Sequence, residues 1–247
     1  MLIALFLFIR FFSPSDPSAM VASGDEAFLN IDYPAAASAY ASALHDHPED
    51  PEILWRLARV YVCIGEVVGE HEHQDFYKTA EAYARWCIQA DSASSDGHTW
   101  LAGALGYIAL DAGMREQIRL SSEVRSETDW ALELNPNDDV AYSIKGSLYR
   151  ALGNVSWLRR QVASIFIGGV PLGGYEESEA ALKKAISLAP AVMRHHYELA
   201  VLYIDWCRNA EAMTILEHAA TLRVQTAIDR PRLANIKELL STLEQNP

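Results

Sequence analysis

Small and apolar residues recur along the chain at the spacing expected of paired amphipathic helices. In each of five predicted units a small residue lies late in the second helix, and the helix ends within the next five positions. The small residues are Ala43, Cys87, Ala131, Ala185 and Ala219, and the ending positions are Pro48, Ser92, Pro136, Pro190 and Val224. A proline excludes the helical conformation from the residue before it, so these positions predict helix ends.

A second small residue recurs within the first helix of each unit. These residues are Gly24, Ala58, Ala102, Gly146 and Ala200, separated by steps of 34, 44, 44 and 54 residues. The steps equal 34 plus multiples of ten, and a 34-residue helix–turn–helix period is that of the tetratricopeptide repeat. Such units bury their apolar faces only by stacking. The sequence therefore predicts an all-α fold, an α-α superhelix of about five helix pairs with the small residues buried at helix crossings.

The same positions set the predicted helix bounds. The pairs cover 18–30 and 34–46, 50–68 and 74–90, 95–112 and 114–134, 138–152 and 174–188, and 192–206 and 208–222. The insertions fall between paired helices, and the insert 154–174 predicts one extra helix followed by a glycine-rich link. A C-terminal capping helix near 230–244 carries Arg232, Lys237, Glu238 and Glu244, which we expect on its polar outer face.

The stretch from Trp130 to Leu182 is more specific than a generic repeat. It contains ALELNP at 131–136, a W-x-x-R-x-V-A core that begins at Trp157, a Pro/Gly link and a Tyr-Glu-Glu helix entry at 175–177. Upstream, residues 118–126 read IRLSSEVRS. These motifs resemble the regulator of microtubule dynamics family over about residues 50–245. The resemblance implies a tetratricopeptide-like domain. Its animal members imply a microtubule role, and similar bacterial proteins are often exported.

Within the insert, Trp157 and Arg160 are three positions apart and share one helix face. We expect Trp157 to be buried against the fourth or fifth unit, with Arg160 reaching a nearby carboxylate or helix C-terminus. The alternative is membrane contact through this apolar insert.

The first residues, MLIALFLFIRFF, are followed by prolines and small residues. Their eight-residue apolar run fits the core of a signal peptide and is too short to span a bilayer. We therefore predict a signal peptide or membrane anchor at 1–22 and a repeat domain at 23–247. An exported, periplasmic or membrane-anchored location is favoured over a cytoplasmic one. A mis-assigned start codon or a buried first helix would also explain the segment, because Arg10 follows the run and no basic residue precedes it.

Charge and composition narrow the classes of partner. The formal net charge of −13 argues against nucleic-acid binding, which depends on neutralising phosphates. Residues 24–75 hold eleven acids against two arginines, whereas residues 140–175 hold four basic residues and no acid. Solvated helix faces are the favoured interpretation, and a basic patch that holds an acidic peptide is the alternative. The three cysteines are far apart, which predicts small buried hydrophobic residues rather than disulfides or a metal pair.

Candidate chemistry is sparse. His71, Glu72 and His73 form a histidine-rich stretch, but residues two apart cannot share a helical face, so we interpret it as a polar rim rather than a metal site. No nucleophile motif or phosphate loop is recognisable. The sequence therefore predicts no catalysis, no cofactor and no metal.

Two functions are open at this point. The first is a non-enzymatic scaffold that binds a peptide or protein partner in the concave groove of the superhelix. Its expected partner-binding residues are Trp55, Arg59, Arg150, Arg194 and Tyr197, chosen by helical position and by the aromatic and arginine content of binding hot spots. The alternative is a membrane- or cytoskeleton-associated structural protein. Its solenoid would pack against a membrane or polymer through the insert 154–174, and the N-terminus would give a further membrane contact. Microtubule binding rests on the family resemblance alone.

Overall fold

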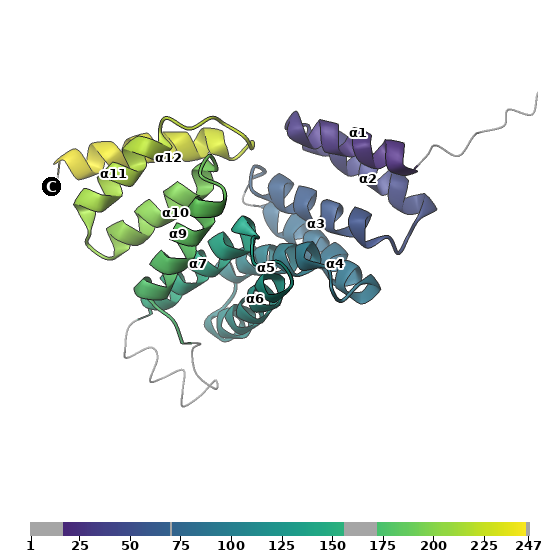
Figure 1. The fold of residues 1–247 in the computed structure, drawn as a ribbon, viewed down its shortest axis with the longest axis horizontal. Helices are drawn as coiled ribbons and strands as arrows, with labels where there is room; N and C mark the ends of the chain where they lie inside the picture. Colours follow the sequence, from purple (N-terminus) through teal and green to yellow (C-terminus); the bar gives the residue numbers. More distant parts are fainter. Residues whose placement is uncertain (1–16, 70, 156–171, 246–247) are drawn as a thin grey trace, which may run out of the picture.

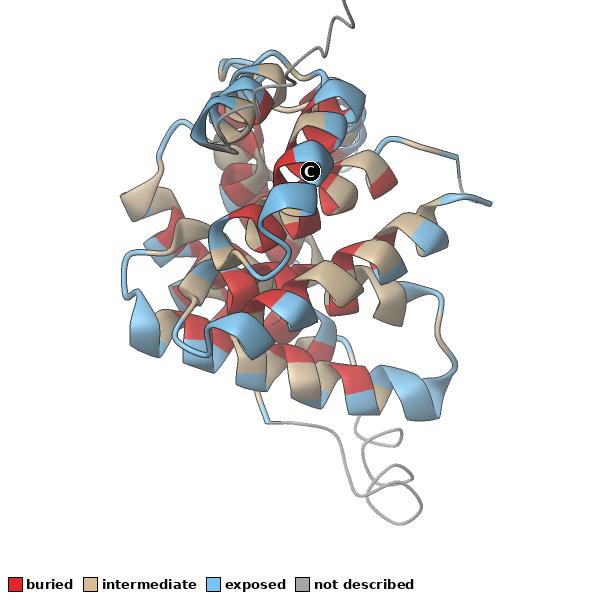
Figure 2. Cartoon of the chain, turned by 90° about the vertical axis from the view of Figure 1, so that its right-hand side faces the viewer, coloured by how far each residue is buried: buried red, intermediate tan, exposed pale blue. Residues whose placement is uncertain are grey.

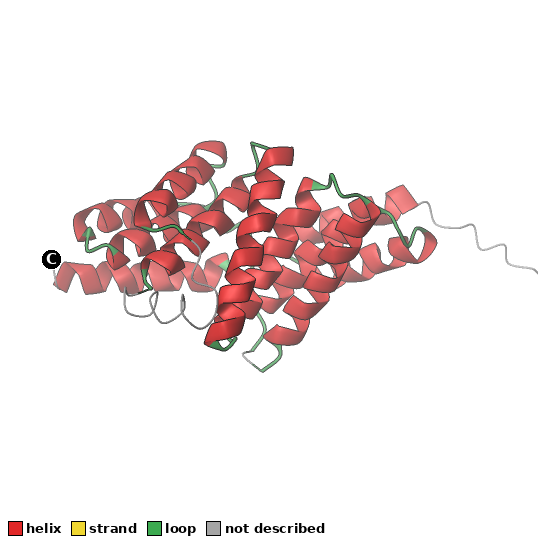
Figure 3. Cartoon of the chain, turned by 90° about the horizontal axis from the view of Figure 1, so that it is seen from below, coloured by secondary structure: helices red, strands yellow, loops and turns green. Residues whose placement is uncertain are grey.

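The computed structural model describes residues 17–69, 71–155 and 172–245, and within these ranges it contains helices and no strand (Figure 3). The paired helices are α1 (Pro17–Leu29) with α2 (Tyr33–Asp46), α3 (Pro51–Gly65) with α4 (His73–Ala90), α5 (Ser95–Leu110) with α6 (Met114–Leu134), α7 (Asp139–Gly153) with α9 (Tyr175–Leu188), and α10 (Met193–Asp205) with α11 (Asn209–Ala219). A last helix, α12 (Asp229–Gln245), packs on α10 and α11. The predicted all-helical fold of five pairs and a closing helix is confirmed.

Two helices end three residues earlier than predicted. Helix α3 ends at Gly65 rather than at 68, where the glycine lies against the ring of Tyr77. Helix α11 ends at Ala219 rather than at 222, because the chain continues there as a tight turn. Helix α1 begins at Pro17, one residue before its predicted start at 18, and so overlaps the predicted leader segment 1–22. The predicted insert helix, with Trp157 and Arg160, lies outside the described residues.

Four connections between units share one turn. The N–H four positions after the small residue donates to its carbonyl: His47 to Ala43, Asp91 to Cys87, Asn135 to Ala131 and Ala189 to Ala185. A second hydrogen bond spans the following turn, as from Asp50 N–H to His47 O at 3.2 Å. Pro48, Pro136 and Pro190 occupy the second position of this turn, which proline favours because its φ is already set. The repeated small-residue and proline spacing therefore encodes this turn.

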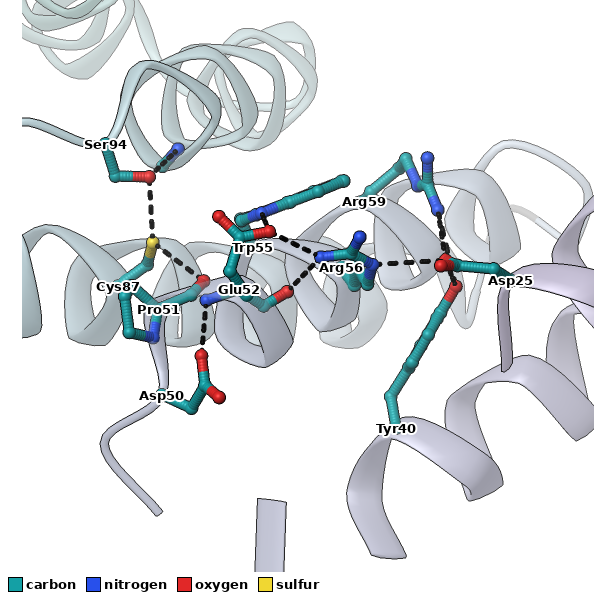
Figure 4. A network of polar contacts seen from close by, with 11 residues as sticks. Asp25, Tyr40, Asp50, Pro51, Glu52, Trp55, Arg56, Arg59, Cys87 and Ser94 are labelled. Carbon is teal, nitrogen blue, oxygen red and sulfur yellow. Dashed lines mark hydrogen bonds and ion pairs between the residues drawn. The ribbon is translucent and has the colours of Figure 1, made fainter. Parts of the chain in front are cut away.

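The turns also position the next helix. Asp50, Ser94 and Asp138 each follow such a turn, and each side chain accepts a hydrogen bond from a backbone N–H in the first turn of the next helix. These caps satisfy donors that the helix itself leaves unpaired. The Cys87 thiol lies 3.4 Å from the carbonyl of Pro51 and 3.3 Å from the Ser94 hydroxyl, so it joins the second and third units at this point (Figure 4).

The predicted small residues do lie buried where helices cross. Ala58, Ala102 and Ala200 are fully buried, and Gly24 and Gly146 are buried as well. A Cβ at Gly146 would lie 2.5 Å from Cγ of the buried Leu182 on α9. Glycine is therefore required here because α7 and α9 approach too closely for any side chain. The buried apolar residues form three clusters, and the buried segments lie along the inner sides of the packed helices (Figure 2).

The five units follow an arc whose two ends lie on the same side of the molecule (Figure 1). The loop between α11 and α12 reaches back to the first unit, where the N–H of Ala227 donates to the Tyr33 hydroxyl at 3.1 Å. Burial raises the pKa of Tyr33 to about 12, so the phenol keeps its proton. The first and last units of the array are thereby in contact.

The capping helix differs from its prediction at one residue. Lys237, Glu238 and Glu244 are exposed, as expected. Arg232 was expected on the outer face, and this is wrong: it is buried, bound to Asp229 at 2.6 Å, and its guanidinium lies over the ring of Tyr197. Asp229 is buried too and accepts the N–H groups of the preceding loop, so the first turn of α12 faces inward.

Candidate binding site

A groove with a volume of about 430 Å³ lies on the third and fourth units, and we call it the α5–α7 groove. Helices α5, α6 and α7 supply its walls, through side chains such as Trp100, Ile118 and Ile144. Two large apolar side chains in its lining, Leu110 and Met114, are 72% and 53% exposed. An apolar groove with exposed apolar side chains suits the burial of apolar groups from a ligand.

One end of the groove is polar because α7 and α10 place charged side chains there. Arg150 of α7 binds Asp205 at 2.9 Å and lies 3.6 Å from Glu198, both on α10. Glu198 also accepts a hydrogen bond from the Ser147 hydroxyl at 3.0 Å. The Nε of Arg150 is buried without a hydrogen-bond partner among the described residues. This end of the groove thus holds a guanidinium that is oriented by two carboxylates and keeps one unused donor.

Arg194 of α10 lines the same groove and reaches toward the interior of the arc. Its Nη2 donates to the Tyr107 hydroxyl at 2.7 Å, and its Nη1 lies 3.4 Å from the Glu66 carboxylate. The Tyr107 hydroxyl in turn donates to Glu66. Burial raises the pKa of Tyr107, so the phenol keeps the proton that it donates. Burial also raises the pKa of the neighbouring Cys63 thiol to about 12, which makes Cys63 an inert structural cysteine.

Trp55 and Arg59 lie elsewhere, in a polar cluster that joins α1, α2 and α3 (Figure 4). Asp25 of α1 accepts hydrogen bonds from the Tyr40 hydroxyl at 2.7 Å and from Arg56 Nε at 3.1 Å, and it lies 3.6 Å from Arg59. The Arg59 guanidinium also lies over the ring of Phe28 at 3.8 Å. We call this set the N-terminal cluster. Its charges are matched between the first and second units.

The Trp55 ring is held by two contacts within the same cluster. Its indole nitrogen donates to Glu52 at 3.1 Å, and the guanidinium of Arg56 lies over the ring at 4.3 Å. Stacking on an arginine fixes the ring and leaves it partly exposed.

The five predicted partner-binding residues thus fall into three places. Arg150 and Arg194 come together at the polar end of the α5–α7 groove, Trp55 and Arg59 belong to the N-terminal cluster, and Tyr197 is half-buried beside Arg232. The sequence reasoning missed Glu66, Tyr107 and Glu198. Glu66 was counted among the acids of the segment 24–75, whereas its side chain is only 5% exposed.

The basic segment 140–175, which contrasts with the acidic segment 24–75, forms ion pairs with acids from elsewhere in the chain. Of the four basic residues between 140 and 175, Lys145 binds Asp129 at 2.5 Å and Arg150 binds Asp205. Arg159 and Arg160 lie outside the described residues. The two described cations are therefore partnered by acids from other segments, and they do not form a free basic patch.

The histidine-rich stretch forms ordinary polar contacts. His73 lies 2.6 Å from Asp111 at the end of α5, and Gln74 donates to the same carboxylate. Across the described ranges no group of three or more histidine, cysteine or acidic side chains could hold a metal ion. None of the described helices combines the length and apolar character needed to cross a membrane.

Comparison with known proteins decides the family. Residues 20–244 match the family model described as Regulator of microtubule dynamics protein 1-3. The chain belongs to this family. Regulator of microtubule dynamics protein 2 from Homo sapiens is 24% identical over 208 residues, which cover 82% of this chain and 51% of that protein. Protein 1 of the same name from Bos taurus is 26% identical over 144 residues, covering 58% and 45%. The chain spans about half the length of the curated relatives it matches.

Solved structures place this member of the regulator of microtubule dynamics family among tetratricopeptide-like folds. A thermophilic TPR protein from Thermus thermophilus superimposes with a TM-score of 0.68 at 20% identity, covering 93% of this chain and 100% of that one. Yeast Tom70 gives a TM-score of 0.57 at 16% identity, covering 96% and 42%. The fold and family predicted from the sequence are both confirmed.

Proposed function

We propose that this chain is a non-enzymatic scaffold that binds a peptide or protein segment in the α5–α7 groove. The observation that carries the proposal is the groove itself, in which apolar walls on α5, α6 and α7 lead to a polar end with Arg150 and Arg194. Apolar walls with a few oriented polar groups are the usual composition of a specific binding site. Two of the five predicted partner-binding residues belong to this site.

The partner that suits this groove presents apolar side chains along its length and a polar group at one end. The exposed Leu110 and Met114 would be covered by such a partner, and the Arg150 side chain, which is 25% exposed, would lie beside its polar end. Arg150 itself is held by Asp205 and Glu198, so it is positioned before the partner arrives. Preorganised donors reduce the entropy lost on binding.

A photo-crosslinking residue at position 114 tests this proposal in cells. The expected result is a defined crosslinked partner at position 114 and no such product at position 86. Trp86 is the matched control because it is equally exposed, at 53%, and lies on α4 outside the groove lining. The captured segment is then synthesised and its affinity measured for the wild type and for Ile118→Arg. An unchanged affinity, or equal crosslinking at both positions, would contradict binding in the groove.

Family membership favours a second candidate, association with microtubules. The matched relatives are named for regulating microtubule dynamics, and we carry this role to the present chain as a proposal only. Co-sedimentation of the full chain with polymerised tubulin tests it. Saturable pelleting with polymer supports the role, and pelleting equal to that with unpolymerised tubulin argues against it.

The prediction for residues 1–22 remains a proposal. Residues 1–16 lie outside the described ranges, whereas Met20 and Val21 pack against the apolar cluster of the first unit. We propose that any signal peptide or anchor ends before these residues. N-terminal sequencing of the native protein tests this, since a mature chain beginning after residue 22 would contradict it.

A further inference from the structure

The interior of the arc is crossed by polar side chains from units that are not neighbours. Arg194 belongs to the fifth unit, Tyr107 to the third and Glu66 to the end of α3 in the second. We call these three residues the interior clamp. In most repeat arrays each unit contacts only the next, so contacts that skip units are exceptional.

The clamp joins helices that do not otherwise pack together. Helix α10 packs on α7, α9, α11 and α12, and among the described residues neither α3 nor α5 makes comparable backbone contact with it. The connection is therefore made by long side chains across the arc, through Arg194 Nη2 to Tyr107 Oη at 2.7 Å and Arg194 Nη1 to Glu66 Oε1 at 3.4 Å.

Each member of the clamp is fixed in place. The Glu66 side chain is 5% exposed, so its charge depends on Arg194 and on the Tyr107 hydroxyl for compensation. The ring of Tyr107 stacks on Tyr77 of α4, with 4.6 Å between ring centroids. The second and third units thus present a prepared acceptor pair to the arginine of the fifth.

A second contact joins the loop before α12 to the first unit. The N–H of Ala227 donates to the Tyr33 hydroxyl at 3.1 Å, and Ala227 packs against the apolar cluster of the first unit. Tyr33 is 4% exposed and lies against Phe28, so this contact also has a rigid base on the N-terminal side.

We propose that the interior clamp is a closing device, by which Arg194 draws the fifth unit onto Glu66 and Tyr107 and holds the two ends of the superhelix together. Its release allows the ends to separate at the Tyr33–Ala227 contact and opens the inner face of the array. This proposal concerns the shape of the chain and stands whether or not the α5–α7 groove binds a partner.

Whether the interior clamp holds the two ends together is tested by measuring the distance between them. Spin labels are placed at Ser42 on α2 and Glu217 on α11, both exposed, in a chain carrying Cys207→Ser so that only buried native cysteines remain. Pulsed dipolar spectroscopy of the otherwise native chain should give one narrow distance distribution. The Glu66→Gln and Arg194→Met double variant, which leaves no lone buried charge, should give a longer mean distance and a broader distribution.

Arg119→Met is the matched control, since it also removes an arginine that is paired with carboxylates, but both of its partners, Glu116 and Glu123, lie on its own helix. Its distribution should equal that of the native chain. If the double variant loses its cooperative thermal transition, Tyr107→Phe is used, which removes only the bridging hydroxyl and should broaden the distribution to a smaller extent. A distribution unchanged from the native one, in whichever of these clamp variants folds, overturns the proposal.

Discussion

The N-terminal cluster and the interior clamp both centre on arginines that bind carboxylates, yet they connect the chain differently. Asp25, Arg56 and Arg59 join the first and second units, which already pack through α2 and α3. Glu66 and Arg194 join the second and fifth units, which have little other contact. The Asp25 side chain is 38% exposed and that of Glu66 only 5%. We therefore expect a polar contact to contribute most to stability where the carboxylate is buried and no apolar interface joins the same units.

The largest expected effect comes from removing the arginine of each region. Arg194→Met should lower the free energy of unfolding by about 3 kcal/mol, because it leaves the Glu66 carboxylate buried without its counter-charge. Arg56→Met should cost about 1 kcal/mol or less, because Asp25 remains in contact with water. Urea unfolding monitored by circular dichroism gives both values. Equal losses in the two variants would show that the regions do not differ in this way.

Two glycine-to-alanine variants compare a closely packed helix position with an open one. Gly146→Ala should lower the free energy of unfolding by about 1–2 kcal/mol, since its Cβ would meet the buried Leu182. The matched variant Gly106→Ala, on α5, has no atom within 4 Å of the new Cβ and should gain about 0.5–1 kcal/mol from helix propensity. Thermal unfolding of both variants distinguishes them, and a stabilised Gly146→Ala would mean that α7 and α9 are not in close contact.

Truncation tests how much Met20 and Val21 contribute to the stability of the first unit. A chain that begins at residue 17 keeps Met20 and Val21 in the first apolar cluster, whereas one that begins at residue 23 loses both. We expect the shorter chain to be less stable by about 1–2 kcal/mol, from the apolar area left exposed. The midpoints of urea unfolding compare the two chains. Identical midpoints would return the domain boundary to residue 23.

A smaller effect should follow pH at His98, which links α5 to α6 within the third unit. Its Nδ1 lies 2.5 Å from Glu127 and its Nε2 lies 3.2 Å from the Ser92 carbonyl, so only the protonated ring satisfies both acceptors. The hydrogen bond to Glu127 raises the pKa of His98, although burial opposes it. The resulting stability is complete below a pH of about 6.5 and is lost as pH rises through the folded-state pKa.

The difference in melting temperature between the wild type and His98→Gln isolates this residue from other titrating groups. This comparison removes the contribution of His196, which both proteins share. Burial lowers the pKa of His196, so its contribution to stability changes with pH in the opposite direction. The wild-type advantage should be larger at pH 5.5 than at pH 8. An advantage that does not change with pH would mean that His98 is not charged in the folded protein.

The sequence predicts the contacts between neighbouring units well and the cross-array contacts poorly. The spacing from Ala43 to Pro48 reports a turn, and because that turn repeats, four of the five connections follow from it. Gly146 is one of the recurring small residues, and it indicates a close helix crossing. Glu66 and Arg194 carry no such signal, because they occupy different positions in their units and meet only when the whole arc has formed.

The candidate site shows the same division. Arg150 and Arg194 were chosen by their position on first helices and both line the α5–α7 groove, whereas Arg59, chosen in the same way, lies in the N-terminal cluster. Their carboxylate partners were missed, since pairing across units cannot be read from charge runs. Arg232 was placed on the wrong face because its partner Asp229 turns the start of α12 inward, and the loop geometry that causes this is not periodic.

A double-mutant cycle between Glu66 and Arg194 tests the central claim most directly, namely that these two residues from distant units act on each other in the folded chain. Unfolding free energies are measured for the wild type, Glu66→Gln, Arg194→Met and the double variant. We predict a coupling of about 1–3 kcal/mol, with the double variant losing clearly less than the sum of the single losses. Losses that add to within about 0.5 kcal/mol would contradict the account, because they would show that the two residues do not interact.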